Sequence, residues 1–155
     1  TVGANADKIM IIKKSDTMDK LKKTKDTYKN RPFILQPFIN SIKKDGEMSL
    51  IFFNKGFSHG LSKVPKKGDF RVQEEHGGTL ELLKNLDKQI INLCKKVLSL
   101  LPYDCFYSRI DLVFNGGHPL LMEIEVIEPS LYFNLEPKSA RLFAKKVSDF
   151  FNHQC

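Results

Sequence analysis

The sequence has no run of apolar residues that approaches the roughly 18 needed to span a membrane, which argues against an integral membrane protein. It has no internal repeat, no low-complexity tract, no zinc-finger spacing and no RNA-binding signature. A secretory signal is also missing from its start, so we expect a cytoplasmic protein. Because the chain opens at Thr1 rather than at a methionine, we expect it to be part of a longer protein.

Cysteine is scarce. There are three cysteines, Cys94, Cys105 and Cys155, an odd number whose spacing matches no metal-binding motif. We therefore expect free thiols in a reducing compartment rather than a disulfide framework.

Length and composition favour one globular domain. The 155 residues are enough for a core, and 41% hydrophobic with 28% charged residues is ordinary for a folded chain. The net charge of +7 predicts a polyanionic ligand, either a nucleic acid or a nucleotide. We expect no nucleic-acid partner, because the lysines gather in short clusters typical of solvated faces and turns, at 13–14, 20–29, 43–44 and 66–67.

The hydrophobic pattern predicts several short strands, then a helix, a hairpin and a last helix. After a loop of small residues at 1–8, strands are expected at 9–12, 33–39, 48–53 and 57–64, an extended segment at 69–73, and a hairpin of 106–114 with 119–127. Helices are expected over 16–29, from a cap at Thr79 to Pro102, and from Pro137 onward. This order is typical of an α+β fold, an antiparallel sheet with helices packed on one face.

Acidic residues mark the predicted hairpin. Glu123 and Glu125 lie two residues apart in an otherwise apolar strand, so both should point to the same face. Asp111 lies on the preceding strand, which Gly116-Gly117 joins to this one, and could be a third ligand. Magnesium that bridges nucleotide phosphates prefers such carboxylate oxygens. The alternative is an edge strand whose acidic residues only discourage pairing with other strands.

Other features upstream could bind an anion or a nucleotide. Lys63, Arg71 and the glycine pair Gly77-Gly78 could form an anion site beside a helix N-terminus, although solvated loop charges explain them equally well. The backbone of residues 33–39 could meet a flat base, or it could be a core strand. Glu47 could accept from a ribose hydroxyl or face solvent.

Taken in order, these motifs resemble the ATP-grasp ligases, specifically bacterial glutathione synthetase and its relatives. The resemblance covers most of residues 31–130 and includes the motifs 45–47, 63–71 and 77–78 as well as the acidic hairpin. It implies an ATP-grasp fold that lacks part of its N-terminal portion. Residues 1–30 would be a remnant of the small ATP-binding subdomain, and residues 31–155 would be the C-terminal subdomain.

The resemblance also implies a reaction. Such enzymes use ATP to convert a carboxylate into an acyl phosphate, which an amine attacks to form an amide, and they are often homodimers. The cofactors would be ATP and Mg²⁺, with Mn²⁺ as a substitute. The implied roles are metal binding by Asp111, Glu123 and Glu125, catalysis by Arg71 and Lys63, and nucleotide or phosphate binding by Gln36, Phe38, Ile39, Glu47, Gly77 and Gly78.

Some positions depart from the glutathione synthetase pattern. Glu125 stands where asparagine is usual, and Ser49 and Lys63 stand where arginine is usual. Arginine and lysine differ in how they bind carboxylates, so the substrate is not expected to be that of glutathione synthesis. His59 and the ending 127–130 are more similar to the uncharacterised or the cycloserine-pathway branch of the ATP-grasp enzymes. The alternative function is a nucleotide-binding module without turnover.

Overall fold

The computed structural model describes residues 9–30 and 32–152. The predicted loop at 1–8 and the thiol of Cys155 lie outside these residues. The chain divides into two units, with the division between Ile39 and Asn40. The subdomain boundary expected at residue 30 therefore remains a prediction. No described helix has the length and apolar character required to cross a membrane.

Among its described residues the first unit contains one helix, α1 (Met18–Tyr28), within the range predicted to be helical. Thr17 caps it by accepting a hydrogen bond from the Lys20 N–H. The ammonium of Lys20 pairs with Asp16 at 2.9 Å, one turn earlier.

Two strands expected in the first unit are absent. Residues 9–12 and 33–39 form no strand, and Ile34 and Leu35 are 77% and 79% exposed. A strand needs a neighbour to complete its hydrogen bonds, and all strands of the described chain belong to the second unit. Pro37 also has no N–H to donate to a ladder. Apolar composition alone was therefore a misleading signal for these two segments.

The second unit is built on one antiparallel sheet with the strand order β3-β2-β1-β4-β5. Its strands are β1 (Glu47–Phe53), β2 (Gly56–Val64), β3 (Thr79–Leu82), β4 (Tyr107–Asn115) and β5 (His118–Glu125). Its α-helices are α2 (Ile42–Asp45), α3 (Lys88–Ser99) and α4 (Pro137–Asn152), and Glu74–His76 form a short 3-10 helix. The antiparallel sheet with helices confirms the predicted α+β class.

Both predicted hairpins are present. Asn54 and Lys55 connect β1 to β2 with φ angles of 48° and 62°. Gly116 and Gly117 connect β4 to β5 with φ angles of 58° and 82°. Positive φ at both central residues is the geometry that matches the right-handed twist of paired strands.

The helix expected from Thr79 begins later. Residues 79–82 form β3, which pairs with the free edge of β2, and Asp87 rather than Thr79 caps α3. Leu80 and Leu82 fit both the two-residue period of a strand and the spacing of a helix, so the pattern alone could not distinguish them. The available strand edge decides the outcome.

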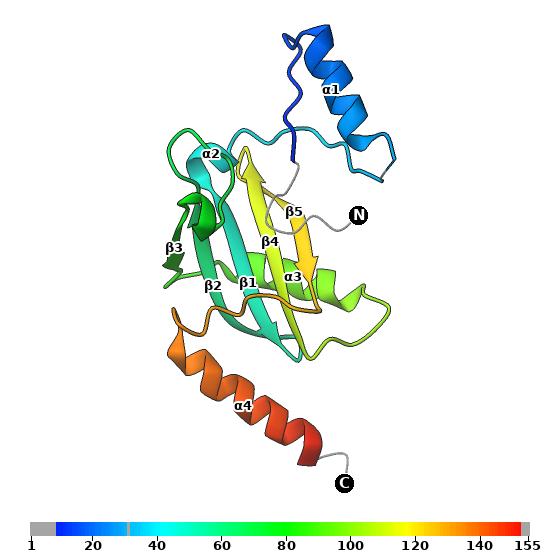
Figure 1. Cartoon of the computed structure of the whole chain (residues 1–155). Helices are drawn as coiled ribbons and strands as arrows, with labels where there is room; N and C mark the ends of the chain where they lie inside the picture. The colour runs from blue at the N-terminus through cyan, green and yellow to red at the C-terminus, as the bar shows by residue number, and fades with distance from the viewer. Residues whose placement is uncertain (1–8, 31, 153–155) are drawn as a thin grey trace. The chain divides into compact units, whose positions relative to one another are not determined.

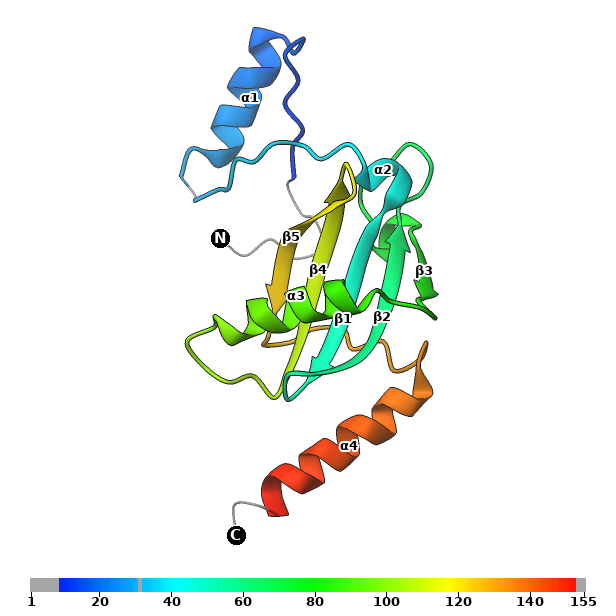
Figure 2. The same cartoon turned by 180° about the vertical axis from the view of Figure 1, so that it is seen from behind.

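Apolar side chains cover both faces of the sheet. On one face, Leu50, Phe52 and Ile110 pack against Cys94 and Leu98 of α3. Figure 2 shows α3 lying across this face. Burial raises the pKa of the Cys94 thiol to about 11, as expected for an inert free cysteine.

The other face is covered by the chain that follows β5. Ile51, Phe53 and Leu61 pack against residues 131–135 and against Phe143 of α4. Figure 1 shows this segment crossing the sheet on the side opposite α3 before α4 begins. The helices therefore do not all lie on one face as expected, because the segment before α4 crosses to the second face.

Gly46 links α2 to β1 and fixes the start of the strand that carries Glu47. Its φ is 71°, and a Cβ there would overlap with the carbonyl oxygen of Lys63 on the neighbouring strand. Only glycine fits this close approach.

We predict that Gly46→Ala lowers the free energy of unfolding by more than about 2 kcal/mol, measured by urea denaturation. Gly68→Ala is the matched control, because Gly68 also has a positive φ of 91° but nothing lies within 4 Å of its added Cβ. Equal losses in the two variants would contradict the steric explanation.

Candidate active site

Three carboxylates converge on one face of the sheet. Asp111 on β4 pairs in register with Glu123 on β5, and Arg109 pairs with Glu125 two residues away. One oxygen each of Asp111, Glu123 and Glu125 lies within 4.8 Å of the others. Two ligands on opposite sides of Mg²⁺ lie about 4.2 Å apart, so small side-chain rotations would let these oxygens share one ion. The donor set suits a hard divalent cation.

The two-residue spacing places these groups together. Glu123 and Glu125 point to the same face of β5, as the sequence predicts. A bulge opposite the step from Asp111 to Leu112 gives β5 one extra residue, Met122. Met122 comes just before Glu123, on the side of the β4–β5 turn, so Glu123 and Glu125 keep their register with Asp111 and Arg109.

Lys63 supplies one counter-charge. It projects from β2, and its ammonium lies 3.0 Å from Glu47 Oε1 and 3.4 Å from Asp111 Oδ2. The side chain is only 6% exposed, so these pairs are little screened by solvent. The structure thus brings the predicted residues Lys63 and Glu47 together with the carboxylate cluster.

Arg109 supplies the second counter-charge. Its guanidinium donates to both oxygens of Asp111 at 3.0–3.1 Å and to Glu125 Oε1 at 2.6 Å. The sequence analysis did not select Arg109 for the site. The signal was available, because Arg109 and Asp111 are two residues apart on one strand and so share a face.

Ser49 and Tyr132 complete the surroundings of the two cations. The Ser49 hydroxyl donates to Asp111 Oδ1 at 2.5 Å. The Tyr132 ring lies 5.6 Å from Lys63 Nζ and 6.0 Å from Arg109 Cζ, within the range of cation–π attraction. Tyr132 has a φ of 51°, which is unusual for a residue with a side chain. The contact of Tyr132 with Lys63 and Arg109 joins residues far apart in the sequence, and no local sequence pattern predicts it.

The cations and carboxylates set one another's ionisation. Burial acts to raise the pKa of Asp111, but Lys63 and Arg109 outweigh it and hold that pKa below the usual value. Burial raises the pKa of Glu47, and Asp111 raises it further. Burial, Glu125 and Asp111 likewise raise the pKa of Glu123. Glu47 is paired with Lys63, so Glu123 is the carboxylate of the cluster that has no counter-charge among the described residues, and Asp111 is the firmly ionised member.

Arg71 and the glycine pair form a separate loop. Arg71 binds the carboxylate of Asp69 through Nη2 at 2.7 Å and through Nε at 3.2 Å. The Gly77 N–H donates to the Glu74 carbonyl, and the Gly78 N–H donates to the Gln73 carbonyl. These donors are thus engaged within their own loop. The expected helix N-terminus beside Gly77-Gly78 is wrong, because β3 follows them.

The expected adenine-binding residues belong to the first unit. Gln36 is exposed, and Phe38 and Ile39 are half-buried, in a segment without regular secondary structure. Their role with a nucleotide remains a prediction.

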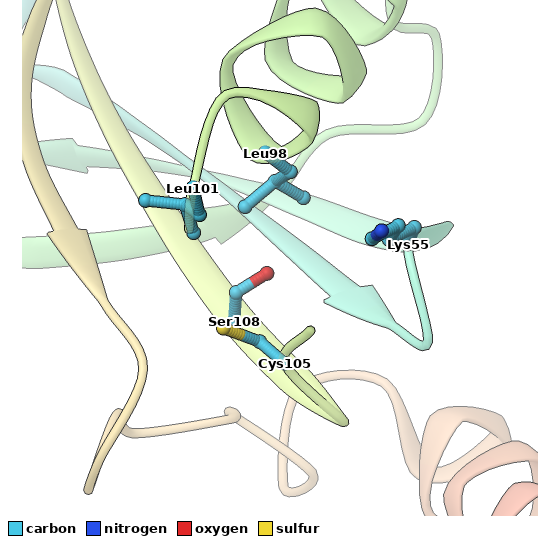
Figure 3. A pocket seen from close by; sticks show the side chains of 5 residues that line it. All are labelled: Lys55, Leu98, Leu101, Cys105 and Ser108. Atoms are coloured by element: carbon cyan, nitrogen blue, oxygen red, sulfur yellow. The ribbon is translucent and has the colours of Figure 1, made fainter. Parts of the chain in front are cut away.

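A small hollow lies elsewhere on the second unit. Figure 3 shows Lys55, Leu98, Leu101, Cys105 and Ser108 lining it. Because neighbouring residues of a strand point to opposite faces, Ser108 faces away from the carboxylate cluster that Arg109 joins. The hollow is therefore distinct from the candidate site.

His59 anchors the segment that carries Tyr132. It is 5% exposed, and its ring bonds Ser58 Oγ at 3.0 Å and the Leu131 carbonyl at 3.1 Å. His59 thus lies on the same sheet face as the site, as a structural residue rather than a base. Burial lowers its pKa below the reference value of 6.5.

We predict that acidification weakens this anchor. The folded state binds the His59 proton less readily than the unfolded state, so its contribution to stability falls as the pH drops below about 6.5. Between pH 7.5 and 5, wild type should lose more unfolding free energy than His59→Gln, whereas His118→Gln, at the exposed hairpin end, should follow wild type. Parallel profiles for His59→Gln and wild type would contradict the prediction.

Comparisons with known proteins identify the family of the chain. Residues 2–139 match the family model described as the ATP-grasp domain of prokaryotic glutathione synthetase. The cycloserine biosynthesis protein DcsG of Streptomyces lavendulae is 31% identical over 128 residues, which are 75% of this chain and 41% of that protein. The chain thus spans less than half the length of this relative.

Solved structures show the same fold. The crystal structure of D-cycloserine synthetase DcsG aligns with a TM-score of 0.61 at 24% identity, covering 74% of this chain and 41% of that one. A D-alanine–D-alanine ligase from Bacillus anthracis, complexed with ATP, aligns with a TM-score of 0.54 at 17% identity, covering 85% and 45%. The family model covers most of this chain, and the chain therefore belongs to the prokaryotic glutathione synthetase ATP-grasp family.

Proposed function

We propose that this chain is the nucleotide- and metal-binding part of an ATP-dependent carboxylate–amine ligase. The observation that carries the proposal is the convergence of Asp111, Glu123 and Glu125 on one sheet face, in a chain of the ATP-grasp family. The substrates would be small molecules, one with a carboxylate and one with an amine. We extend the proposal to a cytoplasmic enzyme, to a homodimer, and to Mn²⁺ as an alternative to Mg²⁺.

The proposed reaction has two steps. A carboxylate oxygen of one substrate attacks the γ-phosphorus of ATP, and ADP leaves with the electrons of the broken bond. The amine of the second substrate then attacks the carbonyl carbon of the acyl phosphate, phosphate leaves with the electrons of the C–O bond, and the nitrogen loses a proton as the amide forms. A magnesium ion held by Asp111, Glu123 and Glu125 would neutralise phosphate charge during the transfer.

The protein's own groups would prepare this chemistry. Lys63 fixes Glu47 and Asp111 by ion pairs, which leaves the second oxygen of Glu47 to accept from a ribose hydroxyl. Arg71 is 38% exposed and would turn from Asp69 toward the transferring phosphoryl group. The amides of Gly77 and Gly78 would join it after a change in their loop. Gln36, Phe38 and Ile39 would contact adenine.

A nucleotide-binding module without turnover is the second candidate. The observation that favours it is the engagement of Arg71 and of both glycine amides within their own loop. A site in which these donors never reach the phosphate would bind ATP without transferring the phosphoryl group.

Metal-dependent nucleotide binding tests the part shared by both candidates. We predict that ADP with Mg²⁺ raises the melting temperature of the chain by several degrees, because a ligand that binds only the folded state stabilises it. Glu123→Gln should lose most of this shift, and Mg²⁺ removal should do the same. The matched control, Glu128→Gln, removes an exposed carboxylate just beyond β5 and should keep the shift. An undiminished shift in Glu123→Gln would contradict the proposed metal site.

Turnover separates the two candidates. In the full-length protein, phosphate release from ATP should require a carboxylate and an amine together, and a panel of amino acids would identify them.

We predict that Arg71→Met lowers this rate of phosphate release by about 10²–10³ while the ADP-dependent melting shift remains. Arg141→Met on α4 also removes an exposed guanidinium and should keep full activity. Bound nucleotide with no stimulated release in wild type would favour the module without turnover.

A further inference from the structure

The candidate site contains more carboxylates than cations. Four acidic side chains share the sheet face, Glu47, Asp111, Glu123 and Glu125, and the two basic side chains that pair with them are Lys63 and Arg109. Like charges this close repel one another unless a positive group lies between them. In the protein without bound metal, the two basic side chains must provide this compensation.

The two cations divide the task between them. Lys63 joins Glu47 to Asp111, whereas Arg109 joins Asp111 to Glu125. Within the described residues, Glu123 forms no ion pair. Arg109 is therefore the group that links two of the three candidate metal ligands, and Glu123 is the ligand left for an external cation.

We propose that Arg109 is the internal counter-cation of the metal site, which holds Asp111 and Glu125 together when no ion is bound and offsets part of their charge when an ion binds. This inference rests on the proposed function, in which the three carboxylates hold a divalent cation. It assigns Arg109 as a positioning residue that acts through the metal ligands.

The geometry suits this role. The planar guanidinium contacts both oxygens of Asp111 and still donates to Glu125 through Nη2. A lysine ammonium at this position would be a point charge and would lack the planar fork that binds both oxygens of Asp111. The Arg109 side chain is 8% exposed, so water and salt screen its interactions weakly. The Tyr132 ring adds a further cation–π contact at 6.0 Å.

The alternative is a structural ion pair with no relation to metal binding. In that case the loss of Arg109 would destabilise the fold equally with and without a divalent cation. If Arg109 is the counter-cation, its loss leaves an excess of negative charge that an external cation can neutralise. The two explanations therefore differ in how the stability of Arg109 variants responds to metal.

The first experiment is a double-mutant cycle in EDTA with Arg109→Gln, Glu125→Gln and the combined variant. We expect Arg109→Gln to lower the melting temperature by several degrees, and the added Glu125→Gln to restore most of the loss, because it removes the unpaired charge. Additive losses would overturn the proposal. This arm contains no metal, so its result does not depend on the proposed function.

The second experiment measures Mn²⁺ binding by electron paramagnetic resonance. Arg109→Gln should bind Mn²⁺ at least about tenfold more tightly than wild type, because a positive charge near the ion has been removed. Its melting temperature should also rise more than that of wild type when Mn²⁺ is added. Equal or weaker binding by Arg109→Gln, in a wild type that binds Mn²⁺, would overturn the counter-cation role.

Two further variants keep the test decisive. Lys55→Gln, which breaks an exposed pair with Asp104, controls for a change in net charge. If Arg109→Gln does not fold, Arg109→Lys replaces it, and a lower melting temperature in EDTA that Mn²⁺ restores would support the proposal. If the melting temperature of Arg109→Lys is lowered equally with and without Mn²⁺, the proposal is overturned. If wild type and all variants fail to bind Mn²⁺, the proposed function fails and with it the role of Arg109 toward a bound ion, while the cycle in EDTA still decides whether Arg109 holds Asp111 and Glu125 together.

Discussion

Burial of the Asp111 carboxylate in the middle of the sheet is the constraint on which the site depends. An isolated buried charge costs several kcal/mol, so the surrounding strands must supply donors and opposite charge. Three strands do so: β1 through Ser49, β2 through Lys63, and β4 itself through Arg109. The register of the antiparallel sheet brings these groups together, and the face that they occupy is polar around Asp111 and apolar toward the β1–β2 turn, where Ile51 and Phe53 lie.

The apolar part of that face secures the polar part. Residues 131–135 lie over Ile51 and Leu61, and from the same segment Tyr132 reaches the two cations. His59 binds the carbonyl of Leu131 and so fixes the segment to β2. Hydrophobic burial thus places an aromatic ring over a charged cluster that would otherwise be open on this side. The charged groups of the site come from the sheet, and the segment after β5 completes the site with the Tyr132 ring.

The local parts of this arrangement could be predicted from sequence. The two hairpins follow from alternating apolar residues and short turns, and the carboxylate cluster follows from the two-residue spacing of Glu123 and Glu125. The errors arise where distant partners decide. Residues 79–82 form a strand because β2 offers a free edge. Residues 33–39 form no strand, because the described chain supplies no neighbouring strand for them. The position of Tyr132 depends on the path of the chain after β5.

The bulge at Met122 has an effect beyond the site. β5 is an edge of the sheet, and an exposed edge can recruit strands from other molecules into aggregates. An extra residue interrupts the regular spacing of N–H and C=O groups along the strand, and Glu123 places a charge beside the interruption. The outer edge therefore offers a poor template for strand addition. The residues that gather charge for a ligand thus also make this edge less suited to pairing with a strand of another molecule.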